Sequence, residues 1–176
     1  NWMTRNLVLA GNFNMTNNGD IYKELINIGQ HPKDKSDTVT VLEKLGHFLD
    51  VENQRIYDGY KEYHEKKEIS NLIANELDVG RFLVRATRDF DGGYAIVGLI
   101  GHGDAFLLRD PAGIRPAYYY QDEEVVVAAS ERPAIQTAFN VPSKSIKEMS
   151  PGRALIVKKN GQVKNINFKW NGGLAT

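Results

Sequence analysis

Residues 93–130 constrain the fold of this chain more than any other stretch. Short apolar runs follow one another there at 94–100, 105–109, 116–120 and 125–129, separated by turn-forming residues. Runs of this length, bounded by Gly, Asp or Pro, are typical of β-strands joined by turns. Because apolar residues occupy successive positions, we expect these strands to be buried on both faces. The stretch therefore predicts an antiparallel meander inside a layered domain.

The region before the meander predicts mainly helices. Apolar side chains recur at helical spacing in segments 21–28, 41–49 and 69–86, which are bounded by glycines or capping residues. Segment 52–67 is highly charged, which indicates a solvated helix or an insertion rather than a basic binding patch.

The first residues predict a strand at 7–10 and a loop at 11–20 that is rich in Asn and Gly. One interpretation of this loop is an ordinary strand-to-helix connection. The other is a loop that directs a backbone N–H and an Asn amide at an anion or oxyanion. Asp37 also has two interpretations. It is a favourable charge at a helix start, or a carboxylate that receives a ligand ammonium.

After the meander, a short helix is expected at 130–138, followed by strands at 145–149, 153–157 and 162–168. Helices and strands segregate along the chain, which predicts an α+β fold with largely antiparallel sheets and argues against a doubly wound one. A chain of 176 residues is long enough to form one domain with its own core.

Composition excludes several classes of function. The 22 basic and 22 acidic residues balance, so neither nucleic acid nor a membrane is expected as a partner. No apolar run approaches the ~20 residues that span a bilayer, and we expect a cytoplasmic protein. The sequence has no cysteine, four scattered histidines and no phosphate-binding glycine motif, so neither a metal nor a cofactor is expected.

Several blocks of sequence, in their order, resemble the class II glutamine amidotransferase domain. R-D-P-A-G-I-R-P at 109–116 is closest to the form found in amidophosphoribosyltransferases. The resemblance covers nearly the whole chain, and the other blocks are N-M-T-N at 14–17, S-D-T at 36–38, D-G-G-Y-A-I-V at 91–97, A-S-E at 129–131 and M-S-P-G at 149–152.

The resemblance implies a four-layer αββα N-terminal-nucleophile hydrolase sandwich with antiparallel sheets, here lacking its N-terminal strands. In such enzymes an N-terminal Cys thiol attacks the side-chain amide of glutamine, and its own α-amine is the base. An Asn amide and an adjacent Gly N–H hold the oxyanion, and an Asp holds the substrate ammonium. The ammonia then passes to a phosphoribosyltransferase domain, for phosphoribosylamine synthesis in de novo purine biosynthesis.

The resemblance also implies roles for individual residues. If block 14–17 sets the register, Asn12 and Phe13 occupy the oxyanion positions. Phe13 then replaces the usual Gly and keeps a backbone N–H that can donate. An alternative register puts Gly11 at the Gly position and loses the Asn. Asp37 takes the ammonium-binding position, and block 109–116 is a scaffold without a catalytic role.

Two parts of such an enzyme are not found in the sequence: the nucleophilic Cys and the Arg-containing segment that holds the substrate carboxylate. Both would precede Asn1, whose surroundings look like the middle of a protein, although an ordinary processed terminus is the alternative. Thr4 is not terminal, which argues against it as a substitute nucleophile. We therefore expect a truncated glutaminase domain at 1–170 that is inactive alone, and a tail or linker at 171–176 leading to an absent phosphoribosyltransferase domain.

The expected partners are glutamine and that phosphoribosyltransferase domain, in a parent protein that forms a homo-oligomer. Two other functions remain open. One is a homologue that has lost catalysis and only binds a ligand, which Phe13 favours. The other is a structural or interaction domain that uses segment 52–67 as a docking surface.

Overall fold

The structure is a computed structural model, and it describes residues 2–168. Its elements in chain order are η1 (Met3–Arg5), β1 (Leu7–Met15), α1 (Asn18–Asn27), α2 (Asp37–Tyr60), α3 (Lys66–Glu76), α4 (Val79–Thr87), β2 (Gly92–Ile100), β3 (Ala105–Arg109), β4 (Tyr118–Gln121), β5 (Val126–Ala129), α5 (Arg132–Phe139), η2 (Ser143–Ser145), β6 (Lys147–Glu148), β7 (Arg153–Val157) and β8 (Val163–Asn167).

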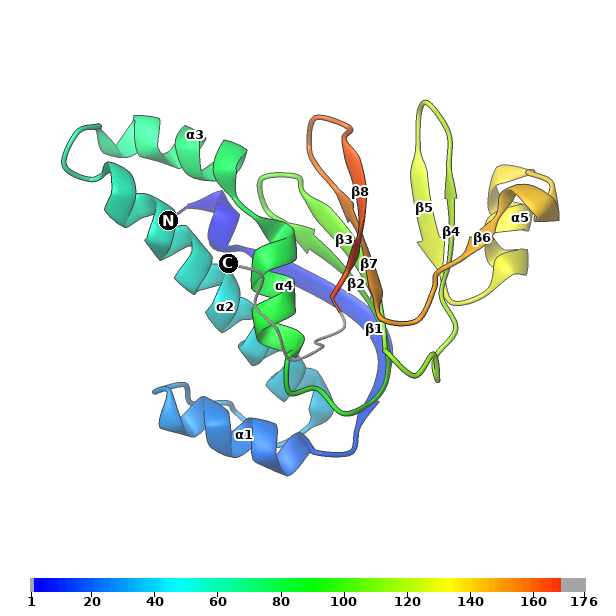
Figure 1. Ribbon diagram of the computed structural model, residues 1–176, viewed down its shortest axis with the longest axis horizontal. Helices are drawn as coiled ribbons and strands as arrows, with labels where there is room; N and C mark the ends of the chain where they lie inside the picture. The colour runs from blue at the N-terminus through cyan, green and yellow to red at the C-terminus, as the bar shows by residue number, and fades with distance from the viewer. Residues whose placement is uncertain (1, 169–176) are drawn as a thin grey trace.

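Two antiparallel sheets lie between two layers of helices (Figure 1). The larger sheet has the strand order β1-β2-β3-β7-β8, and the smaller one has the order β5-β4-β6. Helices α1 to α4 lie on one side of the larger sheet, and α5 lies beside the smaller one (Figure 1). The predicted α+β, four-layer arrangement is therefore confirmed, and neither sheet closes on itself.

The helices form where apolar periodicity predicts them, with two differences. Helix α2 continues to Tyr60 and buries Glu52, Asn53 and Ile56, so the prediction that this part of segment 52–67 is solvated is wrong. The last predicted helix is split into α3 and α4. The break lies at Asp78, whose carboxylate accepts the N–H of Arg81 and caps α4 (3.0 Å).

The predicted meander is divided between the two sheets. Strand β2 pairs with β3 in one sheet, and β4 pairs with β5 in the other. The chain changes sheets in the connection between Arg109 and Tyr118. Strand β3 is buried on both faces as predicted, whereas β4 and β5 are only half-buried. Their short ladders are covered less completely than the larger sheet.

A buried arginine holds this connection together. The guanidinium of Arg109 donates to the carbonyl oxygens of Arg115 (2.6 Å), Gly113 (3.0 Å) and Met149 (2.6 Å), and to the carboxylate of Glu148 (2.8 Å). Glu148 lies in β6, in the smaller sheet, while Arg109 ends β3 in the larger one. The side chain therefore joins the two sheets.

The next residue, Asp110, organises the turn itself. Its buried carboxylate accepts the N–H groups of Ile114 (2.9 Å) and Arg115 (3.0 Å), and its carbonyl accepts the N–H of Gly113 (3.1 Å). The turn predicted from Asp, Pro and Gly is thus present.

The predicted tail at 171–176 lies outside the described residues, as does the end of the predicted 1–170 domain. Within residues 2–168, no helix combines the length and the apolar character needed to cross a membrane.

Candidate functional site

Strand β1 forms one edge of the larger sheet and pairs with β2, with Asn12 opposite Ala95 and Phe13 opposite Tyr94. The prediction of a loop from residue 11 is therefore wrong for residues 11–15, which are strand. The reason is tertiary, since β2 supplies a full-length partner and its pairing outweighs the loop propensity of Asn and Gly. Gly11 suits this ladder because a Cβ there would lie 2.6 Å from the carbonyl oxygen of Ala95.

Side chains of β1 alternate between the two faces of the sheet. Phe13 packs against the core beneath the helices. Asn12 points to the opposite face and lines a cavity of about 270 Å³ between the two sheets. The aromatic ring that replaces a Gly in this position therefore stays out of the cavity.

The backbone N–H of Phe13 points away from β2. Tyr94, the residue opposite, turns both of its backbone groups towards Asp110: its carbonyl accepts the Asp110 N–H (2.8 Å), and its own N–H donates to the Asp110 carboxylate (3.2 Å). Opposed residues in an antiparallel pair exchange either both backbone hydrogen bonds or neither. Phe13 and Tyr94 exchange neither, so the Phe13 N–H projects from the outer edge of the sheet.

Asp37 meets the same edge. Its Oδ2 accepts the N–H of Met15 at 2.7 Å, which ties the first residue of α2 to the end of β1. Residues two apart on a strand direct their N–H groups to the same side, about 7 Å apart. Met15 therefore supports the outward direction of the Phe13 N–H. A carboxylate accepts several hydrogen bonds, so this contact leaves Asp37 able to receive a second donor.

The structure thus brings the predicted site residues Asn12, Phe13 and Asp37 together at one edge of one sheet. Asn12 offers its amide from the inter-sheet side, Phe13 offers an N–H along the edge, and Asp37 places a negative charge at its end. This arrangement suits a small ligand with a carbonyl oxygen at one end and an ammonium at the other.

Comparison with known proteins shows what the chain as a whole is similar to. The amidophosphoribosyltransferase of Pasteurella multocida (strain Pm70) is 28% identical over 163 residues, which are 89% of this chain and 28% of that protein. The chain resembles amidophosphoribosyltransferases in sequence, as predicted. No protein-family model matches it.

Two solved structures share the fold, each with a TM-score of 0.59. The glutamine phosphoribosylpyrophosphate (PRPP) amidotransferase from B. subtilis, complexed with ADP and GMP, is 24% identical, and the match covers 94% of this chain and 30% of that one. A structure described as the allosteric regulatory enzyme of purine biosynthesis is 23% identical, with 94% and 29% covered. The chain thus spans less than a third of the length of these relatives.

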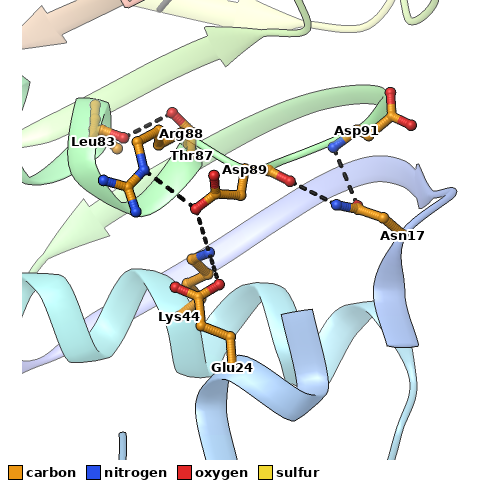
Figure 2. A network of polar contacts seen from close by, with 8 residues as sticks. All are labelled: Asn17, Glu24, Lys44, Leu83, Thr87, Arg88, Asp89 and Asp91. Carbon is orange, nitrogen blue, oxygen red and sulfur yellow. Dashed lines mark hydrogen bonds and ion pairs between the residues drawn. The ribbon is translucent and has the colours of Figure 1, made fainter. Parts of the chain in front are cut away.

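Two sets of polar contacts reach segment 89–91, one from Asn17 and one from Lys44, and neither was predicted from the sequence (Figure 2). Asn17 donates from its amide to the carbonyl of Asp89 (2.7 Å) and accepts the N–H of Asp91 (3.2 Å). Lys44 is fully buried, with its ammonium 2.5 Å from the Glu24 carboxylate and 3.7 Å from that of Asp89. A lysine within the apolar stripe of α2 was the available signal.

Thr4, which was not expected to replace the missing nucleophile, hydrogen-bonds to helix α2. Its side chain is buried, and its hydroxyl donates to the amide oxygen of Asn53 in α2 at 2.5 Å. It therefore serves packing between η1 and α2.

A second polar cluster lies at the start of β3, at the other end of that strand from Arg109. The buried Asp104 carboxylate contacts the ammonium of Lys158, lies 3.0 Å from Nε2 of His102 and accepts the N–H of Lys159 (2.8 Å). Burial alone would raise the pKa of Asp104, but these contacts outweigh it and hold the pKa at about 2. The cluster joins the β2–β3 and β7–β8 turns and has no part in the edge of β1.

Proposed function

We propose that this chain is the glutaminase portion of an amidophosphoribosyltransferase-like protein that supplies ammonia from glutamine for phosphoribosylamine synthesis in purine biosynthesis. The observation that carries the proposal is the common position of Asn12, the Phe13 N–H and Asp37 at the edge of β1. The similarity to amidophosphoribosyltransferases supports the same reading.

In this mechanism, the carbonyl carbon of the glutamine side chain is attacked and its oxygen becomes an oxyanion. The Phe13 N–H and the Asn12 amide donate to that oxygen where the negative charge develops. Asp37 receives the α-ammonium of the substrate. Phe in place of Gly keeps the donor, because both residues have a backbone N–H. The Phe13 ring packs on the helix side and leaves the inter-sheet cavity open.

The 176 residues contain no cysteine, so the attacking thiol belongs to another part of the parent protein. We place it on a segment that precedes residue 1 and reaches the outer edge of β1. By this proposal the chain alone binds glutamine without hydrolysing it. The phosphoribosyltransferase domain, the homo-oligomeric parent and its cytoplasmic location belong to the same proposal.

A second candidate is a binding module derived from the same fold. Phe13, at a position where the family carries Gly, favours it, and the same donors would hold glutamine without chemistry. A parent protein with a Cys at its mature N-terminus supports the enzyme, and a parent without one supports the binding module.

Titration of glutamine into the chain, followed by calorimetry and by an ammonia assay, tests the proposal. Asp37→Asn should weaken binding at least tenfold, because it removes a charged partner of the ammonium. Asp20→Asn is the matched control, since Asp20 is an exposed acidic residue in the first turn of α1, and it should leave binding unchanged.

Binding that is equal in the wild type and the Asp37→Asn variant would refute the assigned role of Asp37. No binding by the wild-type chain or by its full-length parent would refute the function itself. Ammonia release by the 176 residues would show that the thiol is not required.

A further inference from the structure

We infer that Asn17 is a positioning residue, which fixes the register of β1 and thereby aims the Phe13 N–H and the Asn12 side chain. Asn17 touches no substrate in this scheme and acts through the strand. Because the inference rests on the proposed function for its biological meaning, its test below has a readout that does not involve glutamine.

The register of β1 needs such a device. A shift of one residue in an antiparallel ladder moves every side chain to the other face of the sheet. Here it would bring the Phe13 ring into the inter-sheet cavity, turn Asn12 towards the helices and point the Phe13 N–H at β2. The middle of β1 resists such a shift weakly, because Ala10, Gly11 and Asn12 are small or polar and exposed.

Hydrogen bonds at the two ends of the β1–β2 ladder fix the register that the middle of β1 holds weakly. At the start of β1, the N–H of Gly101 donates to the carbonyl of Asn6 (2.9 Å). At its end, the N–H of Thr16 donates to the carbonyl of Asp91 (3.0 Å), and the Thr16 hydroxyl donates to the Asp91 carboxylate (2.6 Å). The side chain of Asn17 adds two further hydrogen bonds at this end, to the backbone of Asp89 and Asp91.

Asn17 is suited to this task because it bonds reciprocally to the turn that leads into β2. Its amide nitrogen donates to Asp89 and its amide oxygen accepts from Asp91, so both of its polar atoms are used on one short segment (Figure 2). A residue that only donates or only accepts cannot hold both sides of this turn.

The same turn is also tied to the helix that carries Asp37. Lys44 of α2 lies 3.7 Å from the Asp89 carboxylate (Figure 2). Independently of this turn, Thr40 of α2 donates to the side chain of Asn18, which follows Asn17 and begins α1. Strand β1 and helix α2 are therefore joined to one segment, which sets the spacing between the Phe13 N–H and Asp37.

Amide hydrogen exchange measured by NMR on the whole chain tests the inference. In the wild type, the amides of Asn12 and Asn14 face β2 and should exchange slowly, whereas the Phe13 amide faces outwards and should exchange fast. In Asn17→Ala, exchange at Asn14 should rise about tenfold or more, with a smaller rise at Asn12.

Two further variants sharpen the test. Asn17→Asp keeps an oxygen for the Asp91 N–H but loses the donor to Asp89, so it should give an intermediate rise at Asn14. Asn27→Ala is the matched control, since Asn27 is an exposed asparagine at the other end of α1. It should leave the β1 pattern unchanged.

Unchanged protection at Asn12 and Asn14 in Asn17→Ala would overturn the inference. So would an equal loss at Ile96 and Leu108, whose amides lie in β2 and β3, because that result describes a merely structural role. If the wild type shows the predicted exchange pattern but binds no glutamine, the proposed function fails while the role of Asn17 in setting the register stands.

Discussion

The two faces of the larger sheet are held by different forces. The helix-side face is closed by apolar side chains that are fully buried, including Val41, Leu45, Ile73 and Phe82. The inter-sheet face buries few apolar residues, and a second cavity of about 460 Å³ opens between the sheets beside half-buried Val126. The smaller sheet meets this face through a small apolar cluster that includes Leu107, Met149 and Leu155, and through the polar contacts of Arg109.

This difference separates the face that stabilises the fold from the face that carries the candidate site. The helix-side core provides most of the apolar burial and thus the hydrophobic stability. The inter-sheet face is lined by small residues such as Ala95, Ala117 and Ala128, which leave room beside Asn12. The candidate site therefore occupies the face that apolar packing leaves incompletely filled.

We expect the largest loss of stability when the hydrogen bonds of Arg109 to the connection between β3 and β4 are removed. Arg109→Ala should lower the free energy of unfolding by about 3 kcal/mol, since three carbonyl oxygens lose a charged donor, whereas the half-exposed Glu148 carboxylate can be solvated. Urea unfolding measures this loss. Arg132→Ala is the control, because its guanidinium lies at the surface of α5 over the ring of Tyr118, and it should cost less than about 1 kcal/mol.

The same variant tests whether the two sheets are stabilised separately. In Arg109→Ala, amides of β4 and β5 should lose hydrogen-exchange protection before those of β2 and β3. Simultaneous loss in both sheets would contradict the contrast drawn between the two faces.

A pair of valines compares the two faces directly. Val41→Ala should cost about 2 kcal/mol, because it leaves a cavity in the closed helix-side core. Val126→Ala removes the same atoms from the half-open inter-sheet side and should cost less than about 1 kcal/mol. Thermal or urea unfolding of the two variants decides the matter. Equal costs would mean that the inter-sheet space is as well packed as the helix side.

We expect a smaller loss of stability when low pH protonates the Asp104 carboxylate. Its pKa in the folded state is about 2, below the ordinary value of 3.8, so its contribution is complete at neutral pH and is lost as the pH falls towards 2. Between about pH 7 and about pH 3 this group should lose about 1 kcal/mol of stability.

Asp104→Asn isolates that contribution. Its deficit against the wild type should shrink as the pH falls, as measured by urea unfolding across the range. Asp20→Asn is the control, because the Asp20 side chain is exposed in the first turn of α1, and its difference from the wild type should stay small throughout. A deficit for Asp104→Asn that does not change with pH would contradict this role.

Local patterns predicted the elements that depend on near neighbours. Apolar spacing and a glycine bound α1, Ser36 and Asp37 mark the start of α2, and β3 and β7 lie where short apolar runs end at turns. The register that places Asn12 and Phe13 in the oxyanion positions came from the resemblance, and the structure adds a position for each that suits the predicted role. Their part in binding stays a prediction.

Local sequence patterns specify most of the helices, strands and turns, since apolar period and turn chemistry act over a few residues. Three features required the folded chain: residues 11–15 form strand, β3 and β4 enter different sheets, and the Phe13 N–H faces outwards. Each of these depends on a partner far along the chain: β2 for the strand, Glu148 for the joined sheets, and Asp110 for the direction of Tyr94. Such long-range pairing leaves no local signal in the residues that it orients.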